Sequence, residues 1–277
     1  MTAPIEAPLI TGIAEEHQPA GSSAPGWPLV LYFHHVHPGV DHYTAVGPED
    51  FERGLERVLE DFAPYDPADL FAGPDGGARR PDRPTVLITF DDGYRDNFTL
   101  AAPILDRLGV RALFFVCTGL LGRRSPRPRE DHLTWTECDR LADDGHLIAA
   151  HTRTHPHLDR IPREQARDEV AGSLEDIAHR YGPRAARLFA YPYGGIPRDD
   201  VLPDDVLAFG TVRSPALPWT HAPRAVRRTY LPSGRTGTWD GLVRHWRARW
   251  DAGRTTGAAA PPGVRPDRLP DAPEGDS

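Results

Sequence analysis

Two adjacent carboxylates, Asp91 and Asp92, directly follow an apolar run in the stretch Thr89-Phe-Asp-Asp-Gly93. Like charges side by side at the end of a buried strand are costly, because they repel each other and burial disfavours ionisation. A divalent cation would offset that cost. Asp-Asp-Gly also occurs in ordinary turns, so this stretch by itself favours a functional site only modestly over a turn.

Two histidines, His151 and His155, form a second candidate group directly after the apolar segment 147–150. On a helical turn, side chains four residues apart project from the same face, so the two imidazoles could bind one metal ion. One carboxylate and two imidazoles make three protein ligands and leave positions open for water and substrate, as in catalytic metal sites. The other carboxylate could then act as a base.

A third stretch, Leu188-Phe-Ala-Tyr-Pro-Tyr-Gly-Gly195, leads from an apolar run into a turn rich in proline, glycine and aromatic residues. Such a turn suits a pocket wall whose backbone N–H groups face a ligand. Turns of this kind are common, so this stretch has meaning only beside the other two.

Strands that alternate with helices are expected to position these groups. Apolar runs predict buried strands at 29–33, 85–90, 112–116, 147–150, 188–191 and 209–212. Helices are predicted from Gly47 through Phe62, and over 101–108, 135–142 and 163–181, with Gly109 and Gly182 ending two of them. This alternation predicts an α/β fold with a parallel sheet, in which polar residues gather at the carboxyl ends of the strands.

Composition excludes several other classes of protein. All 32 basic residues are Arg, the formal net charge is −8, and no basic stripe is long enough to follow nucleic acid. No segment approaches the ~20 apolar residues of a membrane span. Residues 1–26 lack the basic and apolar regions of a signal peptide, so we expect a cytoplasmic protein. Cys117 and Cys138 match no zinc or disulfide pattern.

The organisation along the chain follows from the same composition. Residues 1–26 are predicted to be a disordered leader, residues 27–251 a single domain, and residues 252–277 a flexible tail. The helical segment 238–250 contains Trp239, Trp246 and Trp250, which we expect to pack on the domain rather than on a partner. The oligomeric state cannot be inferred from the sequence.

In their order and spacing, Thr89–Gly93, His151–His155 and Phe189–Gly194 resemble the first three motifs of the polysaccharide deacetylases, carbohydrate esterase family 4, with its NodB-type domain. The resemblance extends over roughly residues 27–235. It implies a distorted (β/α) barrel with about seven strands. It also implies that Asp91 is the catalytic base, that Asp92, His151 and His155 bind the metal, and that the Tyr193 N–H belongs to an oxyanion hole.

Two features depart from the usual family pattern. Ala190 stands where many members have an Arg that pairs with the base, and the late Leu-x-His motif is not evident. Both departures are shared with a subgroup that includes the poly-N-acetylglucosamine deacetylases, whose barrel opens with a strand ending in Tyr-His. Leu31-Tyr-Phe-His-His-Val36 resembles that opening. Arg228 is a loosely aligned candidate for the missing Arg.

The resemblance selects His34 as the general acid for the leaving amine. His35, His221 and His245 are the other candidates. Side chains on a strand alternate, so His34 and His35 are predicted to point to opposite faces, and only one can enter the centre of a barrel.

The expected function is a metal-dependent amidohydrolase that removes an N-acetyl or related acyl group from an amino-sugar or glycan substrate. Zinc is the default metal, and Co²⁺, Ni²⁺ or Fe²⁺ suit the same ligands. One alternative is an inactive carbohydrate-binding barrel. Another is an iron enzyme with two histidines and one carboxylate, which would leave Asp91 and the Tyr193 turn unexplained. For a cytoplasmic enzyme, a sugar nucleotide, a glycolipid or a small metabolite is favoured over a cell-wall polymer.

Overall fold

The computed structural model describes most of residues 28–251. The described ranges are 28–40, 45–72, 83–125, 131–210, 224–226, 228, 239–241, 243–244, 247–248 and 251. The strands are β1 Leu29–Phe33, β2 His35–Val36, β3 Ala45–Val46, β4 Ala63–Pro64, β5 Thr85–Phe90, β6 Ala112–Val116, β7 Leu147–Ala150, β8 Leu188–Ala190 and β9 Leu207–Phe209. The α-helices are α2 Pro48–Asp61, α3 Ala102–Arg107, α4 Trp135–Asp143 and α5 Arg163–Tyr181.

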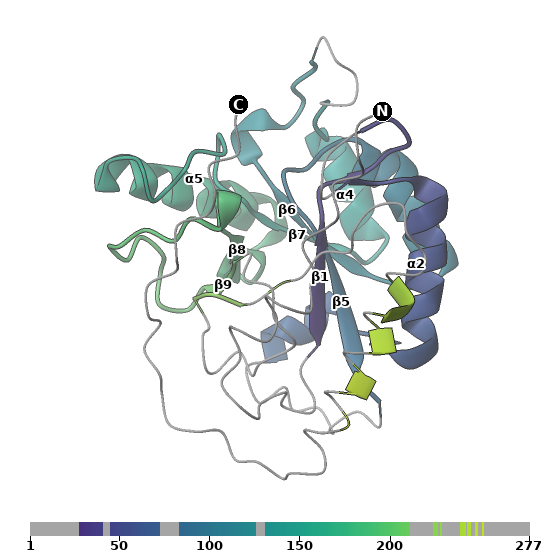
Figure 1. The fold of residues 1–277 in the computed structure, drawn as a ribbon. Coiled ribbons are helices and arrows are strands. Elements are labelled where there is room, and N and C mark those ends of the chain that lie inside the picture. Colours follow the sequence, from purple (N-terminus) through teal and green to yellow (C-terminus); the bar gives the residue numbers. More distant parts are fainter. Residues whose placement is uncertain are drawn as a thin grey trace, which may run out of the picture.

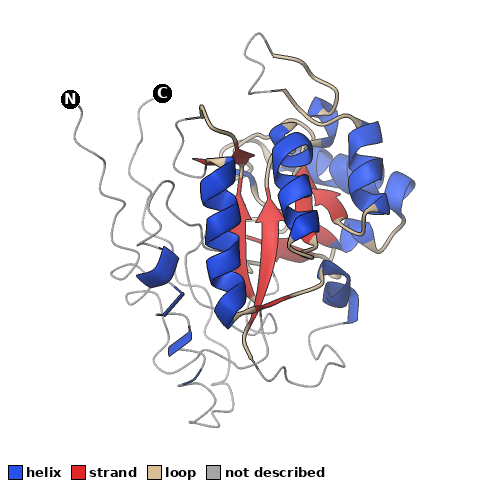
Figure 2. Ribbon diagram, turned by 90° about the vertical axis from the view of Figure 1, so that its right-hand side faces the viewer, coloured by secondary structure: helices blue, strands red, loops and turns tan. Residues whose placement is uncertain are grey.

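The principal sheet is parallel and runs in the order β1-β5-β6-β7-β8-β9, with β4 pairing with the first two residues of β5. It curls around an interior, and α2, α4 and α5 lie along it (Figures 1 and 2). The α/β class and the parallel sheet predicted from the sequence are confirmed. Because Phe33 pairs with Phe90 and Val116 with Ala150, the carboxyl ends of neighbouring strands lie at one edge of the sheet.

Alternate residues along the strands of the principal sheet pack in two different hydrophobic cores. In β5, Val86, Ile88 and Phe90 pack in the cluster that contains the apolar side chains of the helices. Leu87 packs on the opposite face with side chains from β1, β6, β7, β8 and β9, so this second cluster fills the interior of the curled sheet. Side chains that continue the Leu87 alternation, such as Thr89, therefore point toward the interior.

Helix boundaries agree closely with the sequence predictions. Helix α5 spans the predicted residues 163–181 and ends at Gly182, whose φ of 86° is a conformation that favours glycine. Gly109, after α3, is likewise left-handed with φ 66°. Helix α4 begins with a capping box in which Thr134 and Glu137 satisfy each other's backbone N–H groups.

Two strand predictions were displaced at their ends. The strand predicted at 209–212 is instead β9, Leu207–Phe209. These three residues form a strand because they pair with the three residues of β8. Residues 211–212 of the predicted strand lie outside the described residues. Strand β8 ends at Ala190, since Pro192, which has no N–H, begins the turn that follows.

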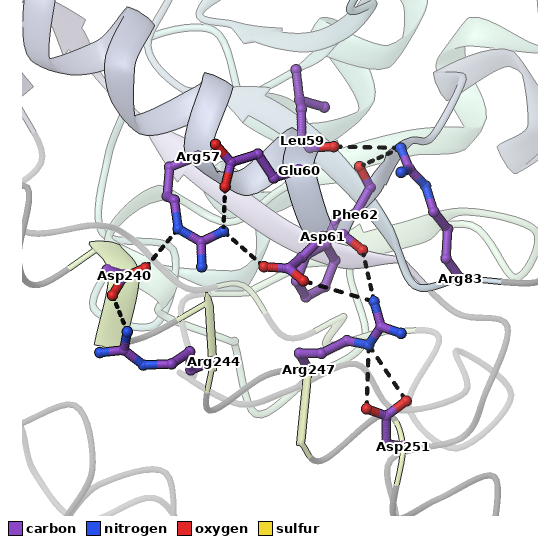
Figure 3. Close-up of polar contacts among 10 residues, drawn as sticks. All are labelled: Arg57, Leu59, Glu60, Asp61, Phe62, Arg83, Asp240, Arg244, Arg247 and Asp251. Carbon is purple, nitrogen blue, oxygen red and sulfur yellow. Dashed lines mark hydrogen bonds and ion pairs between the residues drawn. The ribbon is translucent and has the colours of Figure 1, made fainter.

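The segment near residue 240 packs on α2, as predicted for Trp239. The Trp239 side chain is buried, and a Cβ atom added to Gly54 of α2 would lie 2.3 Å from its ring. Around this contact, Arg57 Nε lies 2.6 Å from Asp240 Oδ1, and Arg247 Nη1 lies 3.8 Å from Asp61 Oδ1 (Figure 3). The absence of a side chain at Gly54 is thus what lets the indole approach the helix.

The predicted leader 1–26 and tail 252–277 lie outside the described residues, and so do His221, His245, Trp246 and Trp250. Both cysteines are buried and free. Among the described residues, no helix combines the length and apolar character that crossing a membrane requires.

Candidate active site

Asp91 and Asp92 follow β5 at the carboxyl edge of the sheet, and both are buried. Asp91 continues the alternation of Leu87 and Thr89, which aims its side chain into the interior. Strict alternation would aim Asp92 away, but its backbone is left-handed with φ 70°. This change of conformation lets two adjacent carboxylates face the same site.

Asp92 lies between the two predicted histidine ligands. Its Oδ1 atom is 3.2 Å from His151 Nε2 and 3.0 Å from His155 Nε2. Within the described part of the chain, these three residues form a group that could hold a metal ion, with ligand atoms all within 4.8 Å of one another. The structure thus brings together the three side chains that the sequence selected.

The backbone that positions the histidines differs from the prediction. Residues 151–155 form a loop rather than a helical turn. Thr152 and His155 are both left-handed, with φ 66° and 63°, and the His155 N–H donates to Thr152 Oγ1 at 3.1 Å. The helical prediction was wrong because spacing alone cannot distinguish a helix from a loop that two left-handed residues fold back on itself.

The donor atoms fit a divalent metal. Asp92 Oδ1 and His151 Nε2 are buried, and neither makes a hydrogen bond with the described residues. His151 Nδ1 lies 2.8 Å from the Ala190 carbonyl oxygen. When Nδ1 carries the proton and donates to that carbonyl, the Nε2 lone pair is free to bind a metal. Two imidazole nitrogens and one carboxylate oxygen are a ligand set of catalytic zinc sites.

Arg228 is distant from Asp91 in the sequence, but in the folded chain it binds the Asp91 carboxylate. Its Nη1 and Nη2 donate to the two carboxylate oxygens of Asp91, each at 2.7 Å, across 137 residues of sequence. Its Nε donates to the Gly210 carbonyl at 2.8 Å. Arg228 has no exposed surface, and its guanidinium lies 4.8 Å from the centroid of the Tyr32 ring. The loosely aligned candidate for the missing Arg therefore does pair with Asp91.

Both carboxylates are expected to be ionised. Burial alone would raise the pKa of Asp91, but the charges of Arg228 and His151 lower it below its ordinary value. Burial opposes ionisation of Asp92 as well, yet His34, His151 and His155 hold its pKa well below the ordinary value. Arg228 and the histidines thus supply part of the compensation that two adjacent carboxylates require.

His34 and His35 point in different directions. His34 Nε2 lies 3.9 Å from Asp92 Oδ2, at the site. His35 Nδ1 lies 2.7 Å from Asp96 Oδ2, and its ring stacks on Tyr94 with 3.8 Å between centroids. His34 is thus placed where a general acid would be needed, whereas His35 is engaged away from the metal ligands. The catalytic role of His34 stays a prediction.

The Tyr193 turn lies beside the histidine loop. Tyr193 is left-handed with φ 56°, and its side chain is 58% exposed. Its ring stacks on His157, with centroids 3.7 Å apart, and meets the His155 ring edge-on at 4.5 Å. The Tyr193 ring thus contacts one of the candidate metal ligands, and the oxyanion-hole role of the Tyr193 N–H stays a prediction.

Left-handed backbone is concentrated at this site. Among the described residues, the non-glycine residues with positive φ are Asp92, Thr152, His155 and Tyr193. Each such conformation costs of order 1 kcal/mol or more and persists only where surrounding contacts enforce it. Strain gathered in three loops at one sheet edge marks that edge as the functional one.

Two buried residues that the sequence analysis did not select support the His34 segment. Asn97 Nδ2 donates to the His34 carbonyl at 2.8 Å, and Asp96 binds His35. Asp96 precedes and Asn97 begins a π-helical turn, Asn97–Ala101, a feature frequent at functional sites. In the sequence, these two residues could have been found as an Asp-Asn pair that follows Asp91 and Asp92 closely and begins a helix with an apolar face.

Comparison with known proteins agrees with this geometry. Residues 78–203 match the family model described as polysaccharide deacetylase. This span contains Asp91, Asp92, His151, His155 and Tyr193. This part of the chain, somewhat less than half of it, is similar to the polysaccharide deacetylases. His34 and Arg228 lie outside the matched span, so the structure is the stronger guide to those two residues.

Curated relatives match this chain over part of their length. The chain is 33% identical over 114 residues to a peptidoglycan-N-acetylglucosamine deacetylase of Bacillus cereus, covering 40% of this chain and 37% of that protein. It is 34% identical over 122 residues to a chitooligosaccharide deacetylase of Sinorhizobium fredii, covering 43% of this chain and 51% of that protein. The aligned part thus spans about half of these relatives or less.

Solved structures share the fold over most of the chain. IcaB from Ammonifex degensii superposes with a TM-score of 0.67 at 22% identity, covering 81% of this chain and 98% of that one. The deacetylase PplD of Streptococcus pyogenes, solved with acetate, gives a TM-score of 0.65 at 20% identity, and the match covers 79% of this chain and 98% of that one. At these identities the likeness establishes the (β/α) architecture of the domain.

Proposed function

We propose that this protein is a metal-dependent hydrolase that removes an N-acetyl group from an amino-sugar-containing substrate. The observation that carries the proposal is the group Asp92, His151 and His155 beside a second buried carboxylate, Asp91, which Arg228 holds in place. Metal ligands next to an independently anchored carboxylate are the parts needed for hydrolysis by an activated water.

The substrate class is proposed from the relatives. The Bacillus cereus and Sinorhizobium fredii proteins are named for peptidoglycan N-acetylglucosamine and for chitooligosaccharide. Both substrates present an acetamido group on an amino sugar. We therefore propose a glycan or smaller conjugate carrying N-acetylated amino sugar as the substrate of this chain.

Asp92, His151 and His155 would hold the metal, and zinc is the first candidate for this ligand set, with Co²⁺, Ni²⁺ and Fe²⁺ also suitable. When bound, such an ion polarises an amide carbonyl and makes water acidic enough to attack near neutral pH. The His151 Nδ1 contact with Ala190 would keep that ligand oriented.

The remaining residues would handle protons and charge. Asp91, kept ionised by Arg228, accepts the proton of the attacking water. The Tyr193 N–H donates to the oxygen that becomes negatively charged, a contribution of about 3 kcal/mol for one well-placed donor. His34 protonates the departing amine, since neutral amines are far better leaving groups than amide anions. Products are acetate and the free amino sugar.

Two other readings use the same ligands. An iron oxygenase with two histidines and one carboxylate would leave the Asp91–Arg228 pair without a role. An inactive carbohydrate-binding barrel would have no need to retain a metal group and a base together. Neither reading is favoured by a specific observation.

Removal of the metal is the direct test of the proposed function. The purified protein should release acetate and free amine from N-acetylated chitooligosaccharides, as measured by an acetate assay and amine labelling. Dialysis against a strong chelator should abolish release, and added zinc should restore it, because three ligands hold the ion that activates water. Full activity after exhaustive removal of metal would contradict the proposal.

Substitution of His34 tests the proposed general acid. His34→Ala should keep its metal content and lower turnover of an N-acetyl amide by about 100-fold or more, as expected when a positioned proton donor is lost. Turnover of an activated acetate ester should fall by less than about tenfold, since the leaving group of the ester needs little protonation. His179→Ala, an exposed histidine of α5, is the control and should match wild type. Equal losses on both substrates would refute the assignment.

A further inference from the structure

The loop that carries His151 and His155 is held from both sides by other elements. Two of its residues, Thr152 and His155, are left-handed, so the loop would not keep this shape by local preference. Beyond His151, whose N–H donates to the Val116 carbonyl of β6, the backbone groups of the loop need partners in other elements. Those partners come from the turn after β6 and from α5.

The turn after β6 binds the carbonyl side of the loop. The Thr118 N–H donates to the Thr152 carbonyl at 3.1 Å, and the Gly119 N–H donates to the Arg153 carbonyl at 3.0 Å. A Cβ atom at Gly119 would lie 2.9 Å from the Arg153 oxygen. Glycine at position 119 therefore permits the close approach of the two backbones.

Helix α5 binds the N–H side of the same loop through one carboxylate. Glu169 Oε2 accepts from the Arg153 N–H at 2.9 Å and from the Thr154 N–H at 2.8 Å. Glu169 Oε1 accepts from the Thr154 hydroxyl at 2.6 Å. Three donors from the two residues just before His155 thus converge on a single side chain, and hydrogen bonds to a charged acceptor are the stronger kind.

A second carboxylate of α5, Asp176, completes the attachment. The Arg153 side chain crosses the helix to Asp176, with Nε and Nη2 each 3.3 Å from its oxygens, and the Thr118 hydroxyl donates to Asp176 at 2.6 Å. Gly172 makes room for this crossing, since a Cβ atom there would lie 2.4 Å from the guanidinium. Residues 169, 172 and 176 share one face of α5 by helical spacing.

We propose that Glu169 is a positioning residue that sets the metal affinity of the site by fixing His155; this inference rests on the proposed metal-dependent function. His155 Nε2 lies 3.0 Å from Asp92 Oδ1 only while His155 keeps its left-handed backbone. Without Glu169, two N–H groups before it lose their acceptor, and the segment can relax to an ordinary conformation that carries the imidazole away. Groups that orient metal ligands typically contribute about 10- to 100-fold in affinity.

Zinc affinity of the full chain tests the proposal, by competition with a chromogenic chelator. Glu169→Ala should weaken zinc binding by about 10- to 100-fold relative to wild type. Glu169→Gln keeps one carbonyl oxygen as acceptor, so its loss should be smaller. Glu175→Ala is the matched control: Glu175 is exposed on the same helix, forms no hydrogen bond with the described residues, and should not change the affinity.

The absorption spectrum of the Co²⁺-loaded proteins is a second measurement. It reports the ligands of the metal ion and does not change when only the stability of the fold is reduced. Glu169→Ala should change the intensity of the cobalt bands, because the third ligand is displaced, and Glu175→Ala should not. Wild-type affinity and an unchanged cobalt spectrum in Glu169→Ala, even with a lower Tm, would overturn the proposal. If Glu169→Ala does not fold, the same criteria apply to Glu169→Gln. Failure of the wild-type protein to bind zinc or cobalt would instead overturn the proposed function itself.

Discussion

Replacing Asp91 by Asn should leave the bound metal in place and lower deacetylase turnover by about 100- to 10,000-fold, the usual contribution of a positioned base. Replacing Asp92 by Asn should remove metal and activity together. The reason is geometric: Asp92 Oδ1 lies within 3.2 Å of both histidine Nε2 atoms, whereas both oxygens of Asp91 are occupied by Arg228.

Metal content per chain, measured after gel filtration, and initial rates on an N-acetylated oligosaccharide separate the two roles. Asp168→Asn, an exposed aspartate of α5, serves as the control and should behave as wild type in both measurements. Thermal unfolding should accompany the assay, because Asp91→Asn leaves the Arg228 charge buried. Metal loss in Asp91→Asn with metal retained in Asp92→Asn would reverse the assignment.

Replacing Arg228 by Met should destabilise the protein by about 3–5 kcal/mol, the usual effect of removing one partner of a buried ion pair. Arg228 and Asp91 are almost completely buried, so Asp91 would be left as an uncompensated charge in the interior. The double variant Asp91→Asn/Arg228→Met should regain much of that stability, since it buries no unpaired charge. It should remain inactive, because it has no base.

Urea unfolding of the single and double variants measures this coupling. Arg224→Met is the matched control: Arg224 belongs to the same segment but pairs with the exposed carboxylates of Asp200 and Asp204. Its loss should cost no more than about 1 kcal/mol, as for surface ion pairs. An Arg228→Met variant as stable as Arg224→Met would show that the buried pair contributes little, and would remove the basis for regarding Arg228 as the anchor of Asp91.

The sequence by itself determined the class of fold and the residues to be tested. Strands of a parallel sheet are covered on both faces, so they appear as continuous apolar runs, and 29–33, 85–90 and 112–116 were predicted with their observed bounds. Parallel strands also bring their carboxyl ends to one edge, which is why residues after β5, β7 and β8 could be expected to meet. Alternation predicted that His34 and His35 point in different directions, and the family resemblance selected His34 of the two.

Tertiary structure alone decided how those residues are held. The spacing of His151 and His155 is the same for a helix and for a loop with two left-handed residues, and the choice depends on Glu169 of α5 and on the turn after β6. Arg228 lies 137 residues from Asp91, and no local pattern connects the two. Propensity and periodicity act over a few residues, whereas a buried charge is compensated by whichever partner the folded chain brings beside it.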